Sequence, residues 1–221
     1  MDETIKKSWE AAYLEFREEP MSDYYEHPLV GIMSRKRVQK IIEELETAKG
    51  KTILDAGCEA GYVSLKIAEL GAHVYAFDIV KEAVQILHGH IKNQNRKNIF
   101  AFYGSAHGIF FKENSMDAVV CTEVIEHMPK LDLVFSEFSR VLKPGGKLII
   151  TFPNEAFRKL FYPIIALFGI NTEVEEEVTL FSHSLPDIIR MCEKKFVVKN
   201  VYSLPWFFPL TRFLICEKAS I

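Results

Sequence analysis

Apolar residues in the central part of the chain occur in short runs that alternate with segments of helical periodicity. A run of four to eight apolar residues predicts a buried strand, and apolar residues repeated every three to four positions predict a helix. We therefore expect strands at 52–56, 73–78, 98–103, 117–123 and 147–153, and helices at 34–45, 62–70, 81–93, 133–141 and 185–195. This alternation is typical of a mostly parallel sheet covered by helices on both faces.

The last part of the chain predicts two strands joined by a loop. Residues 197–204 alternate between apolar and polar, and residues 213–216 form an apolar run. Both patterns are typical of strands. The loop between them holds Trp206, Phe207 and Phe208 between two prolines. We expect this loop to be buried, or else to contact a partner, a lipid or an apolar substrate.

A glycine-containing turn follows the first predicted strand. Gly57 allows a positive φ and a close approach of a ligand to the backbone, and Gly61 opens the next helix. Asp78 ends the second strand, where a carboxylate can bind both hydroxyls of an adenosine ribose. The turn lacks the G-x-G-x-x-G spacing of a dinucleotide site, and Asp55 and Glu59 add acids to it. Carboxylates suit a ligand with an ammonium and a sulfonium group, which predicts S-adenosylmethionine.

The stretch 55–61 reads D-A-G-C-E-A-G and resembles the first motif of the class I methyltransferases, D-x-G-C-G-x-G, with Glu59 in place of a glycine. The string L-K-P-G-G at 142–146 is frequent in the same superfamily. Together these motifs cover about residues 35–154. The resemblance implies an α/β fold with a Rossmann-like, seven-stranded, mostly parallel sheet, helices on both faces and an antiparallel C-terminal strand. It also implies S-adenosylmethionine as the cofactor.

The same resemblance suggests which residues hold the cofactor. Asp55 and Gly57 would frame its methionine end, and Asp78 its ribose. Ser105 and Ala106 would meet the adenine, where members of the family often have an aspartate at position 105. The complete expected set of cofactor-binding residues is Asp55, Gly57, Cys58, Gly61, Asp78, Ile79, Ser105, Ala106 and Thr122.

Candidate catalytic residues follow the fourth strand, where Glu123, Glu126 and His127 would share one side of a helical turn. This E-x-x-E-H string resembles the ubiquinone-biosynthesis O-methyltransferases (methyltransferase type 11) and the small-RNA 2′-O-methyltransferases. Three hypotheses stay open. Glu126 and His127 cap and orient the loop; His127 or Glu123 is a general base for an acceptor hydroxyl; or the trio binds a divalent cation, with His183 as a further ligand.

We expect residues 1–221 to form one methyltransferase domain. Its parts are a helical N-terminal lid at 1–45, a cofactor-binding core at 46–154, a substrate-shaping insertion at 155–182, and a C-terminal helix and strand pair at 183–221. In the lid, the basic face of the helix at 34–45 is either solvated, or Arg35 or Arg37 on it contacts the cofactor carboxylate or a substrate phosphate. The apolar segment at 157–169 could wall a pocket or lie on a membrane surface.

Composition narrows the classes of function. A net charge of −3 argues against broad nucleic-acid binding. Four scattered cysteines indicate buried thiols in the reducing cytoplasm, and the N-terminus lacks the pattern of a signal peptide. We infer methyl transfer from S-adenosylmethionine to a small-molecule acceptor, at an oxygen of an apolar or aromatic metabolite. The alternatives are a metal-assisted RNA 2′-O-methyltransferase and a non-catalytic S-adenosylmethionine-binding module. Metal use and oligomeric state are left undetermined by the sequence.

Overall fold

The computed structural model describes residue 25, residues 30–154, residue 157 and residues 183–205 and 210–219. Several expectations lie outside these residues. They concern most of the N-terminal lid before position 30, nearly all of the insertion at 155–182, and the aromatic loop at 206–208. Everything that follows concerns the described residues.

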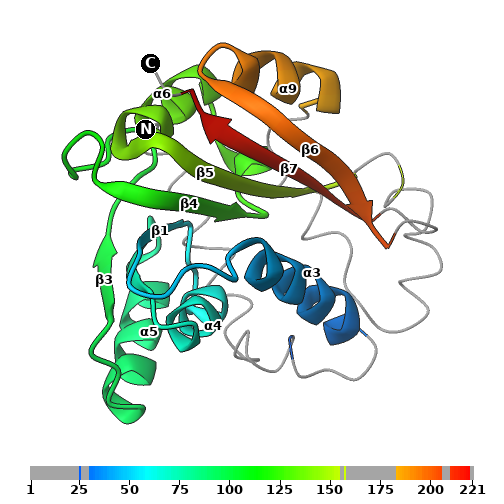
Figure 1. Cartoon of the computed structure of the whole chain (residues 1–221). Helices are drawn as coiled ribbons and strands as arrows, with labels where there is room; N and C mark the ends of the chain where they lie inside the picture. Colours follow the sequence, from blue (N-terminus) through cyan, green and yellow to red (C-terminus); the bar gives the residue numbers. More distant parts are fainter. Residues whose placement is uncertain (1–24, 26–29, 155–156, 158–182, 206–209, 220–221) are drawn as a thin grey trace.

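Seven strands form one sheet in the order β3-β2-β1-β4-β5-β7-β6 (Figure 1). Strands β1 to β5 pair in parallel, whereas β7 runs antiparallel to both of its neighbours. This arrangement confirms the predicted mostly parallel sheet with an antiparallel C-terminal strand. The strands are β1 Thr52–Ala56, β2 His73–Asp78, β3 Ile99–Tyr103, β4 Met116–Thr122, β5 Leu142–Pro153, β6 Phe196–Leu204 and β7 Thr211–Lys218.

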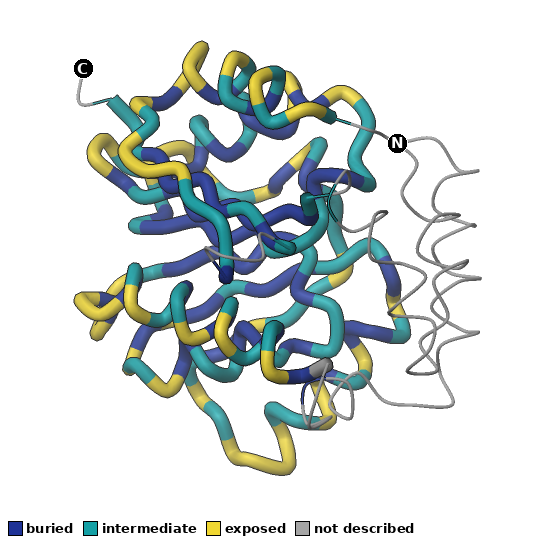
Figure 2. The backbone as a smooth tube through the Cα atoms, turned by 90° about the vertical axis from the view of Figure 1, so that its right-hand side faces the viewer, coloured by how far each residue is buried: buried dark blue, intermediate teal, exposed yellow. Residues whose placement is uncertain are grey.

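Helices cover both faces of the sheet, as predicted. In Figure 1, α6 and α9 lie on one face, and α3, α4 and α5 lie on the other. Each face has its own apolar cluster, and Figure 2 shows the buried strands enclosed between the more exposed helices. The helices are α3 Val30–Glu44, α4 Tyr62–Glu69, α5 Lys81–Asn93, α6 Leu131–Val141 and α9 Leu185–Glu193, with a short 3-10 helix, η2, at Ile125–His127.

The central strands are apolar on both sides, which explains why their sequences lack the alternation of a half-exposed strand. In β1, Leu54 packs into the cluster under α6 and α9, whereas Ile53 packs into the cluster under α3 and α4. In β5, Ile150 likewise packs into the cluster under α6 and α9, and Ile149 packs into the cluster under α3 and α4. Side chains at successive positions of a strand point to opposite faces, so each strand contributes to both cores.

The topology brings the ends of β1, β2 and β4 to one edge of the sheet. The chain leaves β1 toward β2 on one side, and β4 pairs with β1 on the other side. In an open α/β sheet, ligands bind outside the carboxyl ends of the strands at such a switch point. The residues that follow these three strands are therefore the candidates for a binding site.

The L-K-P-G-G string at 142–146 lies inside a strand, whereas the predicted strand begins only at position 147. Helix α6 ends at Val141 as expected, but residues 142–146 lie inside β5 and do not form a separate turn before it. Met116 of β4 pairs with Leu142, and Ala118 pairs with Lys147, so β5 contains extra residues at this point. The string is therefore a bulge in the strand, and Gly145 adopts a φ of 72° there.

The four cysteines are free and buried, in agreement with the expected reduced thiols. Within the described residues, no helix combines the length and the apolar character that crossing a bilayer requires. The core therefore depends on apolar packing, with no disulfide cross-link.

Helix α6 gives a test of where the core lies. Phe138 is 0% exposed, and Leu133 on the same helix is 52% exposed. We expect Phe138→Ala to lower the free energy of unfolding by about 3–5 kcal/mol, because a large apolar side chain leaves a cavity. Leu133→Ala, the matched control, should change it by less than about 1 kcal/mol. Urea denaturation measures both, and equal losses would contradict the assignment.

Candidate cofactor and catalytic site

The turn between β1 and α4 is held against the end of β2. The backbone N–H groups of Gly57 and Cys58 both donate to the carbonyl oxygen of Phe77, at 2.8 and 2.9 Å. Gly57 has a φ of 80°, and a Cβ added there would lie 2.5 Å from a methyl carbon of Val124. Glycine is thus required both by the backbone conformation and by packing against the loop after β4. Gly61, with a φ of 89°, precedes the first residue of α4.

Asp78 lies at the end of β2, as predicted, and joins two backbone segments. Its Oδ2 accepts a hydrogen bond from the N–H of Glu59, and its Oδ1 accepts one from the N–H of Val80, both at 2.9 Å. Burial raises the pKa of Asp78, and these hydrogen bonds reduce that rise. The carboxyl group therefore fixes the turn and the start of α5 relative to each other.

Asp55 is 1% exposed at the end of β1. The Ser64 hydroxyl donates to its Oδ2 at 2.5 Å. Burial raises the pKa of Asp55 to about 7; the Ser64 hydrogen bond lowers it, and the charge of Asp78 raises it. Two carboxyl groups that repel each other in a buried site favour a cationic ligand, because a positive charge relieves the repulsion.

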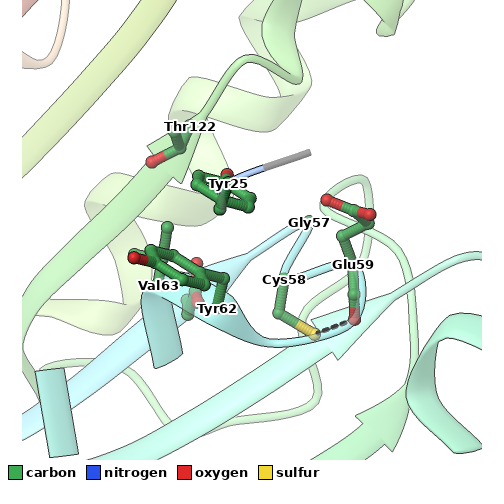
Figure 3. A pocket seen from close by; sticks show the side chains of 8 residues that line it. Tyr25, Gly57, Cys58, Glu59, Tyr62, Val63 and Thr122 are labelled. Atoms are coloured by element: carbon green, nitrogen blue, oxygen red, sulfur yellow. Dashed lines mark hydrogen bonds between the residues drawn. The ribbon is translucent and has the colours of Figure 1, made fainter. Parts of the chain in front are cut away.

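A small cavity opens between this turn and the end of β4 (Figure 3). Over it, the ring of Tyr25 stacks on that of Tyr62 with centroids 3.9 Å apart. Four of the predicted cofactor residues, Asp55, Gly57, Cys58 and Thr122, come together here. The lining residues are Tyr25, Asp55, Gly57, Cys58, Glu59, Tyr62, Val63 and Thr122. Tyr62 was not predicted as a site residue, although its position directly after Gly61 is a local signal.

The predicted adenine residues lie on the loop after β3. The Ser105 hydroxyl accepts a hydrogen bond from the N–H of His107 at 3.3 Å, and Ala106 is buried. The His107 Nε2 lies 2.6 Å from the carbonyl oxygen of Pro129, to which it donates. His107 thus ties the loop after β3 to the loop after η2. Nothing in the local sequence predicted this role, because its partner is 22 positions away.

The three candidate catalytic residues do not share one helical turn. The helix η2 begins only at Ile125, and Glu123 has a φ of 54°, in the left-handed region. The Glu123 carboxylate lies 3.3 Å from the Arg37 guanidinium of α3. Glu126 is 7% exposed, and its Oε1 lies 3.6 Å from the Nε2 of His127. Glu126 and His127 therefore form one pair, and Glu123 belongs to another.

The two basic residues considered for ligand contact, Arg35 and Arg37, are not simply solvated. The Arg37 side chain is 13% exposed and pairs with Glu123. Arg35 donates to the backbone carbonyl oxygen of Tyr25. Both guanidinium groups thus connect α3 to segments around the cavity. Their partners are distant in sequence, which is why helical periodicity alone left a solvated face as an alternative.

Other chemistries find little support in the described residues. These residues contain no group of three or more His, Cys, Asp or Glu side chains arranged to hold a metal ion, so the cation hypothesis with His183 gains no support there. Burial raises the pKa of the Cys58 thiol well above its usual range, and the carboxylates of Asp55, Asp78 and Glu59 raise it further. The thiol stays protonated and is not a nucleophile.

Comparison with known proteins agrees with this geometry. Residues 54–150 match the family model described as "Methyltransferase domain". A ubiquinone biosynthesis O-methyltransferase from Coxiella burnetii is 30% identical over 126 residues, which cover 57% of this chain and 53% of that protein. The chain thus spans about half the length of the curated relatives it matches.

Two solved structures show the same fold. Magnesium protoporphyrin IX methyltransferase from Synechocystis PCC 6803, with bound SAH, has a TM-score of 0.68 at 20% identity and covers 85% of this chain and 84% of its own. A protein from Pyrococcus horikoshii OT3 has a TM-score of 0.70 at 19% identity. The match covers 92% of this chain and 98% of that protein. The two structures show that the chain shares their fold, and residues 54–150 are similar to a methyltransferase domain. Within the 126 aligned residues, the chain is similar to the ubiquinone biosynthesis O-methyltransferases.

The raised pKa of Asp55 predicts a pH dependence of stability. Because the folded protein keeps a proton on Asp55 up to about pH 7, it binds more protons than the unfolded chain between about pH 4 and 7. The free energy of unfolding should therefore fall as the pH rises through this range. Asp55→Asn should flatten that fall, as measured by urea denaturation of the ligand-free protein. Asp132→Asn, at an exposed position of α6, is the control; an unchanged slope in Asp55→Asn would contradict the assignment.

Proposed function

We propose that the protein transfers a methyl group from S-adenosylmethionine to a hydroxyl oxygen of a small apolar or aromatic molecule. The observation that carries this proposal is the arrangement at the switch point of the sheet. There, Asp55 and Asp78 lie at or next to the ends of two neighbouring strands, and the Gly57 turn is tied to β2 by backbone hydrogen bonds. The similarity of residues 54–150 to a methyltransferase domain supports this proposal.

The residues fit this cofactor by their charge and hydrogen-bonding capacity. Buried carboxyl groups suit its ammonium and sulfonium charges, and the Thr122 hydroxyl is buried without a hydrogen-bond partner among the described residues. We assign Asp55, Gly57, Cys58 and Thr122 to its methionine end, and Asp78 with Ile79 to its ribose. Gly61 fixes the turn, and Ser105 and Ala106 complete the adenine side. When bound, S-adenosylmethionine supplies a methyl group on a positively charged sulfur.

Within this proposal, the pair Glu126–His127 handles the acceptor proton. The imidazole takes the proton from the acceptor hydroxyl, and the buried Glu126 carboxylate stabilises the charged imidazolium and orients the ring. Glu123 is paired with Arg37 and serves to position the loop. Methyl transfer is an in-line displacement, so alignment and exclusion of water are the main contributions expected of the protein.

The class of acceptor follows from the relatives. Their name states that they are O-methyltransferases of ubiquinone biosynthesis, which supports an aromatic hydroxyl here. The proposed lid at 1–45 and insertion at 155–182 would enclose such a substrate within the single domain. A net charge of −3 argues against an RNA acceptor. We place the protein in the cytoplasm, where its four buried thiols stay reduced.

The proposal can be tested with S-adenosylmethionine that carries a labelled methyl group. The protein is incubated with a panel of phenols and catechols of increasing side-chain length, and with RNA as a separate acceptor. Labelled methyl ethers and formation of S-adenosylhomocysteine would support the proposed reaction. Label in RNA alone would overturn the choice of acceptor, and failure to bind S-adenosylmethionine would overturn the function.

Asp78 gives a test of the cofactor site. Asp78→Asn should weaken S-adenosylmethionine binding at least tenfold in calorimetry, because hydrogen bonds to a charged group contribute about 1.5–3 kcal/mol. Asp117→Asn is the matched control: Asp117 also accepts a backbone hydrogen bond, from Thr52, and pairs with Lys143, but it lies at the opposite end of β4. Equal affinities in the two variants would contradict the assignment of Asp78.

His127 gives a test of the catalytic role. With an acceptor from the panel, His127→Gln should lower kcat by about 10²- to 10⁴-fold, the usual contribution of a general base. The affinity for S-adenosylmethionine should stay unchanged, because the role concerns the acceptor proton. His88→Gln, in α5, is the control, since the His88 ring lies beside the backbone oxygen of Ala101 in β3. A kcat of His127→Gln within threefold of the wild type would leave His127 with an orienting role only.

A further inference from the structure

We propose that Glu59 is a specificity-determining residue, whose carboxylate makes the site prefer the positively charged cofactor S-adenosylmethionine over the neutral thioether product S-adenosylhomocysteine. The inference rests on the proposed function, because it requires that the site binds both molecules. It concerns a residue that differs from the usual motif, in which a glycine stands at this position.

The backbone at Glu59 is one that favours glycine. Its φ is 50°, in the left-handed region. A residue with a Cβ is disfavoured there by roughly 1–2 kcal/mol. The N–H of Glu59 donates to Asp78, so the conformation is fixed by the same hydrogen bond that ties the turn to β2. A side chain that persists at such a strained position within a binding site indicates a function for that side chain.

The Glu59 side chain faces the cavity. It is one of the residues that line it, together with Asp55 and Thr122. Figure 3 shows its carboxylate projecting from the turn on the side where the Tyr25 ring lies. Although the residue is partly exposed, its Oε1 atom is buried and has no hydrogen-bond partner among the described residues. A buried carboxylate oxygen without a partner is costly, and a cationic ligand would remove that cost.

The charged and titratable groups around Glu59 come from four segments. Asp55 lies near the end of β1, Asp78 ends β2, and the neutral Cys58 thiol precedes Glu59 in the turn. The guanidinium of Arg37, on α3, also faces Glu59, but it already pairs with Glu123. The pKa of Glu59 is raised to about 8, mainly by burial and next by the charge of Asp78; Arg37 lowers it, and Asp55 adds a smaller rise.

Glu59 therefore interacts electrostatically with Asp78, which we assign to the ribose, and with Asp55, which we assign to the methionine end. The sulfonium of the cofactor lies between its ribose and its methionine chain, so a carboxylate between these two aspartates suits that charge. With Arg37 balanced by Glu123, the cavity carries excess negative charge once the pH is high enough to ionise Glu59. This excess favours a cation over a neutral ligand of the same shape.

Cofactor and product differ by one methyl group and one positive charge. A contact with any shared part, including the ammonium, the ribose and the adenine, changes the affinity of both ligands equally. Only a contact with the methyl group or with the sulfonium charge changes their ratio, and a carboxylate acts on the charge. A site that prefers the charged form also releases its product more readily, which would reduce product inhibition.

The test is calorimetric titration of wild type and Glu59→Gln with S-adenosylmethionine and with S-adenosylhomocysteine at pH 8.5 and pH 6.5. At pH 8.5, we expect Glu59→Gln to lower the preference for S-adenosylmethionine about tenfold, or about 1.4 kcal/mol. The effect should shrink at pH 6.5, because Glu59 is then protonated in the empty site. Glu69→Gln removes the same charge from an exposed position of α4 and should leave the ratio unchanged.

Glu59→Gly separates charge from backbone conformation. It restores the glycine of the motif and removes the backbone strain, so it should fold even if Glu59→Gln does not, and it should change the ratio in the same direction. Equal weakening of both ligands, or an unchanged ratio, would overturn the inference and leave the proposed function intact. Absence of binding of either ligand to the wild type would overturn both.

Discussion

The structure depends on holding two carboxyl groups out of water at the ends of adjacent strands. An ionised carboxylate resists burial, and the pKa of Asp55 and that of Asp78 are both raised by it. Hydrogen-bond donors stabilise both carboxyl groups. The Ser64 hydroxyl donates to Asp55, and the N–H groups of Glu59 and Val80 donate to Asp78. Because these donors come from the turn, α4 and the segment before α5, each carboxyl group also fixes the elements that surround it.

The acidic side chains around the cavity also attract an arginine of α3, and this attraction ties the helix to the site. Arg37 brings a positive charge from the N-terminal side of the core to Glu123, after β4, and its charge also reaches Glu59, in the turn after β1. One guanidinium thus acts on two segments separated by more than sixty positions in sequence. The orientation of α3 and the electrostatics of the cavity are therefore linked, and a change in one affects the other.

Local patterns predicted the strands and helices well, because central strands buried on both faces give continuous apolar runs and the covering helices give clear periodicity. The bounds of α5 and β2 agree with the prediction residue for residue. The failures have a common cause in contacts between distant segments. The pairing of Arg37 with Glu123, the link from His107 to Pro129 and the bulge at 142–146 all depend on a partner strand or loop that no local window contains.

In the motif E-x-x-E-H, two side chains of the same type have different surroundings and different partners. Its two glutamates are three positions apart, yet Glu123 lies in a left-handed conformation beside a guanidinium, whereas Glu126 is buried beside an imidazole. The Glu123 carboxylate is already engaged by the Arg37 guanidinium, 3.3 Å away. A histidine beside a buried carboxylate becomes a better proton acceptor, since the carboxylate stabilises the imidazolium. In the proposed mechanism His127 accepts the proton, whereas Glu123 connects the loop to α3 through Arg37.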